Sequence, residues 1–488
     1  MSNILFSHSY FYRFDAKQWK AQQPYPPYGT LYAAAVMREC GFQVHLYDTN
    51  LRENVLDLVP VLKQTAAQYF VLYDDGFNYL TKMCLTRMRA AAFEMIALAK
   101  NAGCKVIVCS SDSTDHFAQY LEKGADFVLL GEGEITLREL ILALEAGNTQ
   151  YNNIPGLAYH DAQLGLLRTG ARPVVTALDS LPDPAWDLVE MADYQRIWQK
   201  AHGYFSLNLA TTRGCPYKCN WCAKPIYGNR YNTRSPERVV DEIEMLIKTY
   251  GARHFWMADD IFGLKPGWVQ RFRDLVQARD LHFTYKIQSR VDLLLQENQI
   301  DALVESGLRQ VWVGAESGSQ RILDVMDKGT KVEEIEQATA LLKQKGVEVC
   351  FFLQFGYLGE TRADIDATLQ LVEKLLPHDI GISVSYPLPG TKFYDKVKSM
   401  LGEKQNWTDS NDLAMMYQGT FVPAFYRRLH KLVHKRFRLK QGLQHWQNLP
   451  QLHRAPLRSL LLTFYYAPAA KVDAFLLKRL ENRKQHAG

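Results

Sequence analysis

The stretch Arg213-Gly-Cys-Pro-Tyr-Lys-Cys-Asn-Trp-Cys222 is the most informative part of this 488-residue chain. It places Cys215, Cys219 and Cys222 in a C-x3-C-x2-C array. Three thiolates at this spacing can hold three irons of a 4Fe–4S cluster and leave the fourth iron without a protein ligand. Such an iron keeps open positions for chemistry. The sequence therefore predicts a reactive cluster with these three cysteines as its metal ligands.

Zinc, simple electron transfer and disulfides explain this array less well. Structural zinc usually has four ligands in two separated pairs, and electron-transfer clusters use four cysteines. The chain starts with a strand-like segment and not with a secretory signal, so we expect a cytoplasmic protein with reduced cysteines. The remaining five cysteines are interpreted as small buried apolar residues: Cys40, Cys84, Cys104, Cys109 and Cys350.

The composition is that of a globular protein with unevenly distributed charge. Apolar residues make up 47% and charged residues 22%, and no apolar run reaches the roughly 18–20 residues that cross a bilayer. Residues 424–488 carry fourteen Lys and Arg against two acidic residues, a net charge of +12. Residues 1–423 therefore carry −7, since the whole chain carries +5. The basic segment fits an anionic partner, and a solvated helical surface explains it equally well.

Residues 1–150 alternate short apolar runs with helical patterns. This alternation predicts a parallel sheet with helices on both faces, which would bind a ligand beyond the carboxyl ends of its strands. Small and polar residues follow each predicted strand, a pattern that suits a flat ligand and also ordinary turns. The predicted strands are Asn3–Ser7, Gln43–Tyr47, Gln68–Tyr73, Lys105–Cys109 and Asp126–Leu130.

A second strand–helix series fills residues 201–401, after a linker at residues 151–200, and a basic helical region follows at 402–488. Six βα units predict an incomplete α/β barrel, whose chemistry lies at the carboxyl ends of its strands. The cysteine array follows the first of these strands. The predicted strands are Ser206–Thr211, His254–Met257, Phe283–Ile287, Gln310–Gly314, Glu348–Leu353 and Gly381–Ser385.

The chain resembles the radical S-adenosylmethionine (SAM) enzymes of the cobalamin-binding class along nearly its whole length. The resemblance implies an α/β fold with a Rossmann-like, flavodoxin-type cobalamin-binding domain, a partial (β/α)6 radical SAM barrel and a helical C-terminal segment. Besides the cysteine array, it rests on Tyr25-Pro-Pro-Tyr-Gly29, Gly131-Glu-Gly-Glu134, Thr211-Thr-Arg-Gly-Cys-Pro, Ser289-Arg290, Gly314-Ala-Glu-Ser-Gly318 and Tyr386-Pro-Leu-Pro-Gly-Thr391.

The resemblance implies three cofactors, namely a 4Fe–4S cluster, SAM and cobalamin, and assigns no catalytic residue beyond the cluster. The implied SAM contacts are Trp221, Asp259, Asp260, Ser289, Arg290 and Glu316. The implied cobalamin contacts are Tyr28, Gly29, Asp48, Gly131, Glu132 and Gly133.

Three of these positions leave alternatives open. Trp221 also fits a core tryptophan, and Arg290 also fits a surface ion pair. Met257-Ala-Asp-Asp260 stands where the family more often has Gly-Gly-Glu. The family's cobalt-ligating motif Asp-x-His-x-x-Gly is absent, because His116 follows Asp115 directly, so no histidine ligand to cobalt is expected.

The stretch from Trp407 to Thr420 is similar to one in the anaerobic magnesium-protoporphyrin monomethyl ester oxidative cyclases and in hopanoid-pathway radical SAM proteins. The likeness implies that a 5′-deoxyadenosyl radical abstracts hydrogen from a large apolar substrate, a tetrapyrrole or polycyclic lipid, and that oxidative cyclisation or rearrangement follows. A radical C-methyltransferase using methylcobalamin is the alternative. Met415, Met416 and Tyr417 fit a substrate pocket and a core equally well.

Two rival classes have less support. An RNA-modifying radical enzyme of the methylthiotransferase kind would need an extra three-cysteine cluster domain, and a non-catalytic iron–sulfur module would not cleave SAM. The resemblance further implies an external electron donor such as flavodoxin or ferredoxin. We expect no nucleic-acid partner. Peripheral contact of the basic C-terminal region with an anionic inner membrane face is a hypothesis that the +12 segment motivates.

Overall fold

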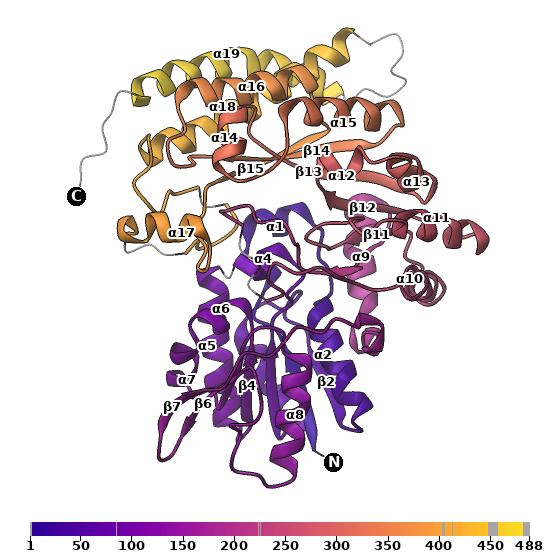
Figure 1. Ribbon diagram of the computed structural model, residues 1–488, viewed down its shortest axis with the longest axis vertical. Coiled ribbons are helices and arrows are strands. Elements are labelled where there is room, and N and C mark those ends of the chain that lie inside the picture. Colours follow the sequence, from indigo (N-terminus) through magenta and orange to yellow (C-terminus); the bar gives the residue numbers. More distant parts are fainter. Residues whose placement is uncertain are drawn as a thin grey trace. The chain divides into compact units, whose positions relative to one another are not determined.

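The computed structural model describes residues 2–83, 85–222, 224, 226–402, 406–411, 413–447 and 457–481. The chain divides into two compact units, shown as a ribbon in Figure 1. The first unit comprises residues 1–217, 224–287 and 406–411, and the second comprises residues 218–223, 288–405 and 412–488. The cysteine array is therefore shared, with Cys215 in the first unit and the other two cysteines in the second.

The first unit contains a seven-stranded sheet in the order β2-β1-β3-β4-β5-β6-β7. Strands β1 to β5 are parallel, and β6 and β7 are antiparallel additions at one edge. The order of the first five is that of a flavodoxin-type sheet, and the predicted α/β class with parallel strands is confirmed. The strands are β1 (Asn3–Ser7), β2 (Gln43–Tyr47), β3 (Tyr69–Tyr73), β4 (Lys105–Cys109), β5 (Phe127–Leu129), β6 (Leu157–Asp161) and β7 (Gly165–Arg168).

The sheet continues into the segment where the sequence predicts a linker. Leu157 of β6 pairs with Leu129 of β5, and the β6–β7 hairpin closes that edge. The same segment also contains most of α9 (Met191–His202), so half of residues 151–200 lie in strands or helices. The four residues of β7 are mostly exposed and alternate weakly, which is why their sequence carries little strand signal.

Alternating side chains of the parallel strands feed two separate cores. Leu5 points to the core that α3 (Leu58–Thr65), α5 (Thr86–Asn101) and α7 (Phe117–Glu122) cover. Ile4 belongs to the opposite core, under α2 (Tyr28–Glu39) and α8 (Glu134–Glu145). This alternation is the period-2 pattern that a sheet covered on both faces requires.

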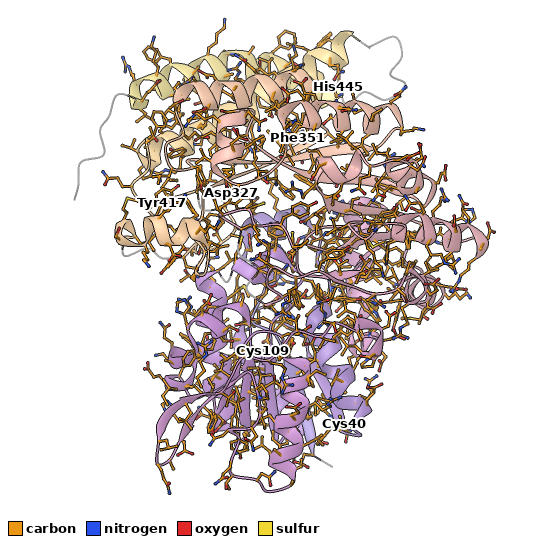
Figure 2. The ribbon with its side chains drawn as sticks, viewed as in Figure 1. Cys40, Cys109, Asp327, Phe351, Tyr417 and His445 are labelled. Carbon is orange, nitrogen blue, oxygen red and sulfur yellow. The ribbon has the colours of Figure 1, made fainter. Side chains whose placement is uncertain are left out.

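The scattered cysteines are mostly core residues, as expected. Cys104, Cys109 and Cys350 are buried, and Figure 2 shows Cys109 within the sheet of the first unit. Cys40 is only partly buried, because it follows the last turn of α2, so full burial was wrong for this residue. The prediction for Cys84 lies outside the described residues.

The second strand–helix series is present with its predicted alternation. In the first unit β8 (Ser206–Leu209), β11 (His254–Met257) and the start of β12 (Thr284–Ser289) are parallel, in the order β8-β11-β12. The last two residues of β12 belong to the second unit. In the second unit β13 (Leu308–Glu316), β14 (Glu348–Phe355) and β15 (Asp379–Val384) are parallel, in the order β13-β14-β15. That these six strands form one partial barrel stays a prediction.

Helix α10 of this series begins at a capping serine. The Ser235 hydroxyl accepts a hydrogen bond from the Arg238 amide, and Pro236 is the first helical residue of α10. The main helices are α10 (Pro236–Tyr250), α11 (Trp268–Ala278), α15 (Val332–Gln344) and α16 (Arg362–Leu375). The shorter elements are α1 (Ala16–Ala21), α4 (Tyr79–Met83), α6 (Ser111–Asp115), β9 (Thr212–Arg213), β10 (Asn232–Thr233), α12 (Val291–Leu294), α13 (Gln299–Glu305), α14 (Gln320–Val325) and α17 (Lys392–Val397).

Two long helices, α18 (Pro423–Gln447) and α19 (Leu457–Glu481), end the second unit. Asp473 of α19 is buried and forms ion pairs with Arg428 at 2.6 Å and Lys435 at 2.7 Å, both on α18. These pairs fix the two helices against each other and neutralise part of the basic segment. No helix within the described ranges combines the length and the apolar character that a membrane span needs.

The carboxyl group of Glu360, just beyond β14, is fully buried. Its Oε2 accepts a hydrogen bond of 2.7 Å from the Gly356 amide, and its Oε1 has no partner among the described residues. Burial, which outweighs the hydrogen bond from Gly356, raises the pKa of Glu360 to about 8.

We expect Glu360→Gln to gain stability over the wild type as the pH rises from 4.5 to about 8. A folded-state pKa above the unfolded one means that the wild type loses about 1.4 kcal/mol of unfolding free energy per pH unit in this window. The neutral amide does not titrate and still accepts the Gly356 hydrogen bond. Urea midpoints measured across the pH range test this, with Glu333→Gln at an exposed position as control. A pH-independent difference would contradict the expectation.

Candidate active site

The loop that carries the cysteines, residues 214–231, starts from a short hairpin base in the first unit. β9 pairs with β10 in antiparallel fashion, with Arg213 opposite Asn232. Gly214 has a left-handed φ of 82°, and a Cβ there would collide with the Arg230 carbonyl oxygen. A glycine is therefore required directly before Cys215.

Asp259 clamps the strand that leads to Cys215. Its Oδ1 accepts hydrogen bonds from the amides of Thr211 at 2.8 Å and Thr212 at 2.6 Å, and the hydroxyls of both threonines donate to the same carboxylate. Burial raises the pKa of Asp259 to about 6 in spite of these bonds. Its neighbour Asp260 pairs with Lys82 at 2.6 Å. The structure thus gives both carboxylates protein partners, and their roles as SAM contacts stay predictions.

Arg213 joins the cysteine-bearing loop to the Gly131–Glu134 loop that follows β5. Its guanidinium pairs with Glu132 and, at 2.8 Å, with Glu134, and the three side chains are only 2–4% exposed. Sequence reasoning missed this link, although Arg213 directly precedes Gly-Cys and two of the four residues in the partner loop are acidic. The guanidinium also lies over three aromatic rings, with centroids 5.3–5.6 Å away: Tyr32, Phe77 and Tyr227.

Close side-chain packing surrounds two glycines at the carboxyl edge of the sheet. A Cβ on Gly76, after β3, would lie 2.7 Å from Cδ1 of Ile226. A Cβ on Gly133 would lie 2.9 Å from the Tyr73 ring and would overlap the Cys109 sulfur. The part of the cysteine-bearing loop around Ile226 and the Gly131–Glu134 loop are therefore both packed tightly onto this edge.

The predicted cobalamin contacts lie around the same edge, and protein groups hold several of them. The Tyr28 hydroxyl donates to Glu242 at 3.1 Å and accepts from Arg234 at 3.0 Å. Asp48 pairs with His8 at 2.9 Å and accepts from the Tyr194 hydroxyl at 2.6 Å, and Glu132 is held by Arg213.

The glycines among these contacts suit a flat ligand better than the side chains do. Gly131 has a φ of 79°, and the nearest heavy atom to a Cβ there is 3.8 Å away. The Gly29 amide donates to Asp75 at 3.1 Å. The Gly131 and Gly133 amides also donate within the protein, to the Thr114 hydroxyl at 3.0 Å and to the Tyr73 hydroxyl at 3.3 Å. What this edge offers a flat ligand is therefore the open space beside Gly131, and all six cobalamin assignments stay predictions.

Asn220 anchors the segment of the array that belongs to the second unit. Its amide donates to the Met326 carbonyl at 3.0 Å, and its Nδ2 donates to the Val325 carbonyl at 2.7 Å. Its Oδ1 accepts from the Tyr357 hydroxyl at 2.7 Å, and its carbonyl accepts from the Phe393 amide at 2.9 Å. This residue fixes the backbone between Cys219 and Cys222. Only its place inside the array could have drawn attention to it.

A buried ammonium, Lys328, lies between Glu316 and Trp221. Its Nζ is 2.8 Å from Glu316 Oε1 and 6.0 Å from the centroid of the Trp221 ring. Burial lowers the pKa of Lys328, but Glu316 and Cys219 outweigh that effect and the net direction is upward. Glu316 has a left-handed φ of 56° at a register shift near the end of β13. Strain of this kind persists only where the surroundings enforce it.

Arg290, just beyond the end of β12, supplies a second cation beside Cys219. Its Nη1 is 3.9 Å from the Cys219 sulfur and donates to the Lys328 carbonyl at 2.8 Å. Its fork also engages Asp292, with Nε–Oδ1 at 2.9 Å, so this guanidinium already has a carboxylate partner. Ser289 is buried at the end of the same strand.

These groups fit the implied cluster and SAM in their chemistry. All three cysteines of the array are partly exposed, and two cations, Arg290 and Lys328, lie near Cys219, whose sulfur would carry negative charge as a metal ligand. The indole N–H of Trp221 is buried without a hydrogen-bond partner in the described part of the chain, so it can donate to a ligand. Among the described residues, no group of three or more His, Cys, Asp or Glu is gathered as a preformed metal site. The ligand assignment to Cys215, Cys219 and Cys222 stays a prediction.

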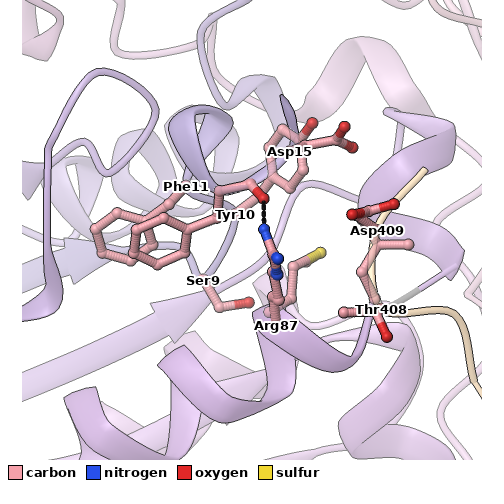
Figure 3. A pocket seen from close by; sticks show the side chains of 10 residues that line it. Ser9, Tyr10, Phe11, Asp15, Arg87, Thr408 and Asp409 are labelled. Carbon is pink, nitrogen blue, oxygen red and sulfur yellow. Dashed lines mark hydrogen bonds between the residues drawn. The ribbon is translucent and has the colours of Figure 1, made fainter. Parts of the chain in front are cut away.

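Parts of the stretch that resembles the cyclases are packed into the protein. In the first unit the Thr86 amide donates to the Trp407 carbonyl at 2.7 Å, and the Ser410 hydroxyl donates to Asp15 at 2.7 Å. Figure 3 shows the cavity at this place, whose lining includes Asp15, Arg87 and Thr408. Its volume of about 10 Å³ holds roughly one water molecule. No large substrate fits there.

Met415, Met416 and Tyr417 are buried in the second unit, where Figure 2 labels Tyr417. The Tyr417 hydroxyl donates to the Gly356 carbonyl, and a Cβ on Gly356 would lie 2.9 Å from the Met415 sulfur. This packing favours the core interpretation of the three residues over the pocket interpretation.

We expect Arg213→Met to lose about 3–5 kcal/mol of unfolding free energy, because two buried carboxylates lose their counter-charge. The triple variant Arg213→Met/Glu132→Gln/Glu134→Gln should recover most of that loss. Urea denaturation of the cofactor-free protein measures both. The control is Arg38→Met, which breaks an exposed pair with Asp187 and should cost less than about 1 kcal/mol. A triple variant as unstable as the single one would show that Arg213 acts through shape and not through charge.

We expect Lys328→Met to lower the midpoint potential of the reconstituted cluster and Glu316→Gln to raise it. Removing a buried positive charge near Cys219 disfavours the added electron, and removing the negative charge favours it. Shifts on the order of tens of millivolts follow from one elementary charge at an effective dielectric of about 20. Redox titration followed by electron paramagnetic resonance measures them, and shifts of the same sign in both variants would refute the expectation.

Comparison with known proteins places this chain among radical SAM proteins. Residues 209–372 match the family model described as the Radical SAM superfamily. The chain is 28% identical to an uncharacterized methyltransferase of Pyrococcus horikoshii, over 78% of this chain and 81% of that protein. It is 24% identical to the hopanoid C-3 methylase of Methylococcus capsulatus, over 83% and 75%. It is 28% identical to the anaerobic magnesium-protoporphyrin IX monomethyl ester cyclase of Rubrivivax gelatinosus, over 58% of this chain but only 51% of the cyclase.

Solved structures share the fold at low identity. The radical SAM methyltransferase TsrM of Kitasatospora setae, with cobalamin and a [4Fe-4S] cluster bound, is 21% identical, with a TM-score of 0.68 over 82% of this chain and 78% of TsrM. The cobalamin-dependent radical enzyme OxsB is 18% identical, with a TM-score of 0.74 over 98% of this chain and 72% of OxsB. The resemblance seen in the sequence is thereby confirmed: residues 209–372 form a radical SAM domain, and the chain shares the fold of the cobalamin-dependent radical SAM enzymes TsrM and OxsB.

Proposed function

We propose that this radical SAM enzyme depends on cobalamin and transfers a methyl group to an unactivated carbon of a large apolar molecule. The observation that supports this proposal is the share of each relative's length that this chain covers. The methyltransferase of Pyrococcus horikoshii aligns with 81% of its own length, whereas the cyclase aligns with about half of its length. Oxidative cyclisation, which the stretch from Trp407 to Thr420 led us to expect, is the second candidate, supported by the 28% identity to the cyclase.

We assign each proposed cofactor to residues described above. Cys215, Cys219 and Cys222 would hold the cluster, Trp221 and Glu316 would contact SAM, and the carboxyl edge of the seven-stranded sheet would hold cobalamin. Bound there, the cluster supplies the electron that cleaves SAM to a 5′-deoxyadenosyl radical, and the corrinoid supplies a methyl carrier.

The residues of the chain prepare these sites by position and charge. Asp259 and Arg213 fix the strand that precedes Cys215. Lys328 and Arg290 place positive charge near Cys219, where the proposed cluster and its thiolate ligands would bring negative charge. The unpartnered indole N–H of Trp221 would orient an acceptor group of SAM. Catalysis by positioning of this kind leaves the difficult chemistry to the cofactors.

The proposed substrate class is a tetrapyrrole or a polycyclic lipid. The names of two relatives, a hopanoid methylase and a magnesium-protoporphyrin ester cyclase, support this class. An external donor such as flavodoxin or ferredoxin would reduce the cluster. The predicted SAM contacts Asp260, Ser289 and Arg290 and the predicted cobalamin contacts at Gly29 and Gly131 are part of the same proposal.

The test is an anaerobic incubation of the protein, reconstituted with iron, sulfide and hydroxocobalamin, with SAM and dithionite. Methyl transfer predicts retained corrinoid and formation of S-adenosylhomocysteine that requires the corrinoid, together with 5′-deoxyadenosine. Deoxyadenosine and retained corrinoid without S-adenosylhomocysteine would favour cyclisation. A fully loaded protein that forms neither product would contradict the proposal.

Cysteine variants control this experiment. Cys219→Ala should abolish cluster assembly and deoxyadenosine formation, because it removes one of three proposed ligands. Cys40→Ala is the matched control, since Cys40 is also partly exposed but lies outside the array. Iron content and the absorption spectrum of the reconstituted protein give a readout independent of activity. Equal iron content in both variants would contradict the ligand assignment.

A further inference from the structure

Helix α19 is apolar on two sides, and the described residues cover only one of them. Residues of one side, such as Ala470 and Leu477, are buried in the second unit, where α19 packs against α18. Figure 1 shows the two helices side by side. The other side exposes large apolar side chains at helical spacing. Their exposed fractions are 71% for Phe464, 58% for Tyr465, 56% for Val472 and 57% for Phe475.

The same exposed side carries three cations and no acid among the described residues. Lys471, Lys478 and Arg479 are exposed and have no ion-pair partner in the described part of the chain. The acids of α19 are engaged elsewhere: Asp473 is buried against α18, and Glu481 pairs with Arg362 of α16. We call Phe464, Tyr465, Lys471, Val472, Phe475, Lys478 and Arg479 the aromatic–basic face.

The cations and rings of this face are interleaved. The Arg479 guanidinium lies 4.5 Å from the centroid of the Phe475 ring. Trp446, near the end of α18, is 42% exposed and meets the Phe464 ring at 6.1 Å, so the apolar surface extends onto the second helix. Aromatic rings with a cation alongside suit a boundary between hydrocarbon and anionic headgroups.

We propose that the aromatic–basic face docks on an anionic lipid surface, with Phe464 and Phe475 entering the acyl boundary and the three cations facing lipid headgroups. An exposed apolar patch of this size on a helix is unusual unless something covers it. Charge selects the occupant, because a face that carries only positive charge is complementary to anionic lipid. A second copy of the chain would bring the same three cations against themselves. The inference does not depend on which reaction the enzyme performs.

The probe is co-sedimentation of the full chain with vesicles of phosphatidylcholine plus phosphatidylglycerol, and with vesicles of phosphatidylcholine alone. We expect clear preference for the anionic vesicles. Lys471→Gln/Lys478→Gln/Arg479→Gln should weaken binding roughly 100-fold, since each cation near the surface contributes about a fivefold factor. Phe464→Ser/Phe475→Ser should weaken binding by at least about tenfold on both kinds of vesicle.

Matched variants separate this face from general effects of charge and apolarity. Lys20→Gln/Lys63→Gln/Lys200→Gln removes three exposed cations of the first unit, and Leu164→Ser removes an apolar side chain that is 68% exposed in the β6–β7 turn. Both should bind like the wild type, and the thermal unfolding midpoints of all variants should agree. Equal binding by wild type and face variants, or no binding at all, would overturn the proposal. Loss of a concentration-dependent dimer in Phe464→Ser/Phe475→Ser, without any lipid binding by the wild type, would assign the face to a second copy instead.

Discussion

The buried pairing of Arg213 with Glu132 and Glu134 is the constraint on which the candidate site in the first unit depends. A single charge at 2–4% exposure would be severely destabilising, and each of these three groups is tolerated only because the others are present. The strand before Cys215 and the loop after β5 must therefore adopt their native positions together. Gly76, Gly133 and Gly214 fit the same close packing, because a Cβ on each would collide with the Ile226 side chain, the Cys109 sulfur and the Arg230 carbonyl oxygen, respectively.

In the second unit the corresponding constraint is the arrangement of charge around Cys219. Lys328 is enclosed by Glu316 and the Trp221 ring, and Arg290 is held by Asp292 and by backbone carbonyls. The left-handed backbone of Glu316 costs about 1–3 kcal/mol by itself, which the register shift in β13 and the ion pair with Lys328 must offset. Groups fixed in this way need little rearrangement when a charged ligand arrives, and preorganised charge is more effective than charge that must reorient.

Local patterns predict the parallel framework of this chain well. Short apolar runs that alternate with helical patterns predicted strands such as Lys105–Cys109 and His254–Met257, and the structure has these strands with the same bounds. The β6–β7 hairpin was not predicted, because its second strand is mostly exposed. An exposed strand lacks the alternation of apolar and polar residues that marks a half-buried one. The cysteine array could be found from spacing alone. Arg213, Asn220 and Lys328 could not, because their ion-pair and hydrogen-bond partners lie 12 to 173 positions away along the chain, and only the folded structure brings them together.

The basic C-terminal segment shows that net charge alone does not identify a binding surface. The structure first has to separate the cations that form ion pairs within the protein from those that do not. Arg428 and Lys435 neutralise the buried Asp473, and Arg436 and Arg438 pair with Glu373 and Asp379, so four cations hold the second unit together. These ion pairs account for part of the net charge of +12 without an external partner, which agrees with the interpretation of the segment as an ordinary helical surface. The cations of the aromatic–basic face differ in kind, because they stand among exposed rings and have no acidic neighbour on their own side of α19. Stability alone gives no reason to expose four large apolar side chains beside unpaired cations, since burying them or replacing them with polar residues would serve a solvated helix better. The exposed side of α19 is thus the part of the basic segment that folding leaves unexplained, and it is there that an anionic surface would supply the missing partner.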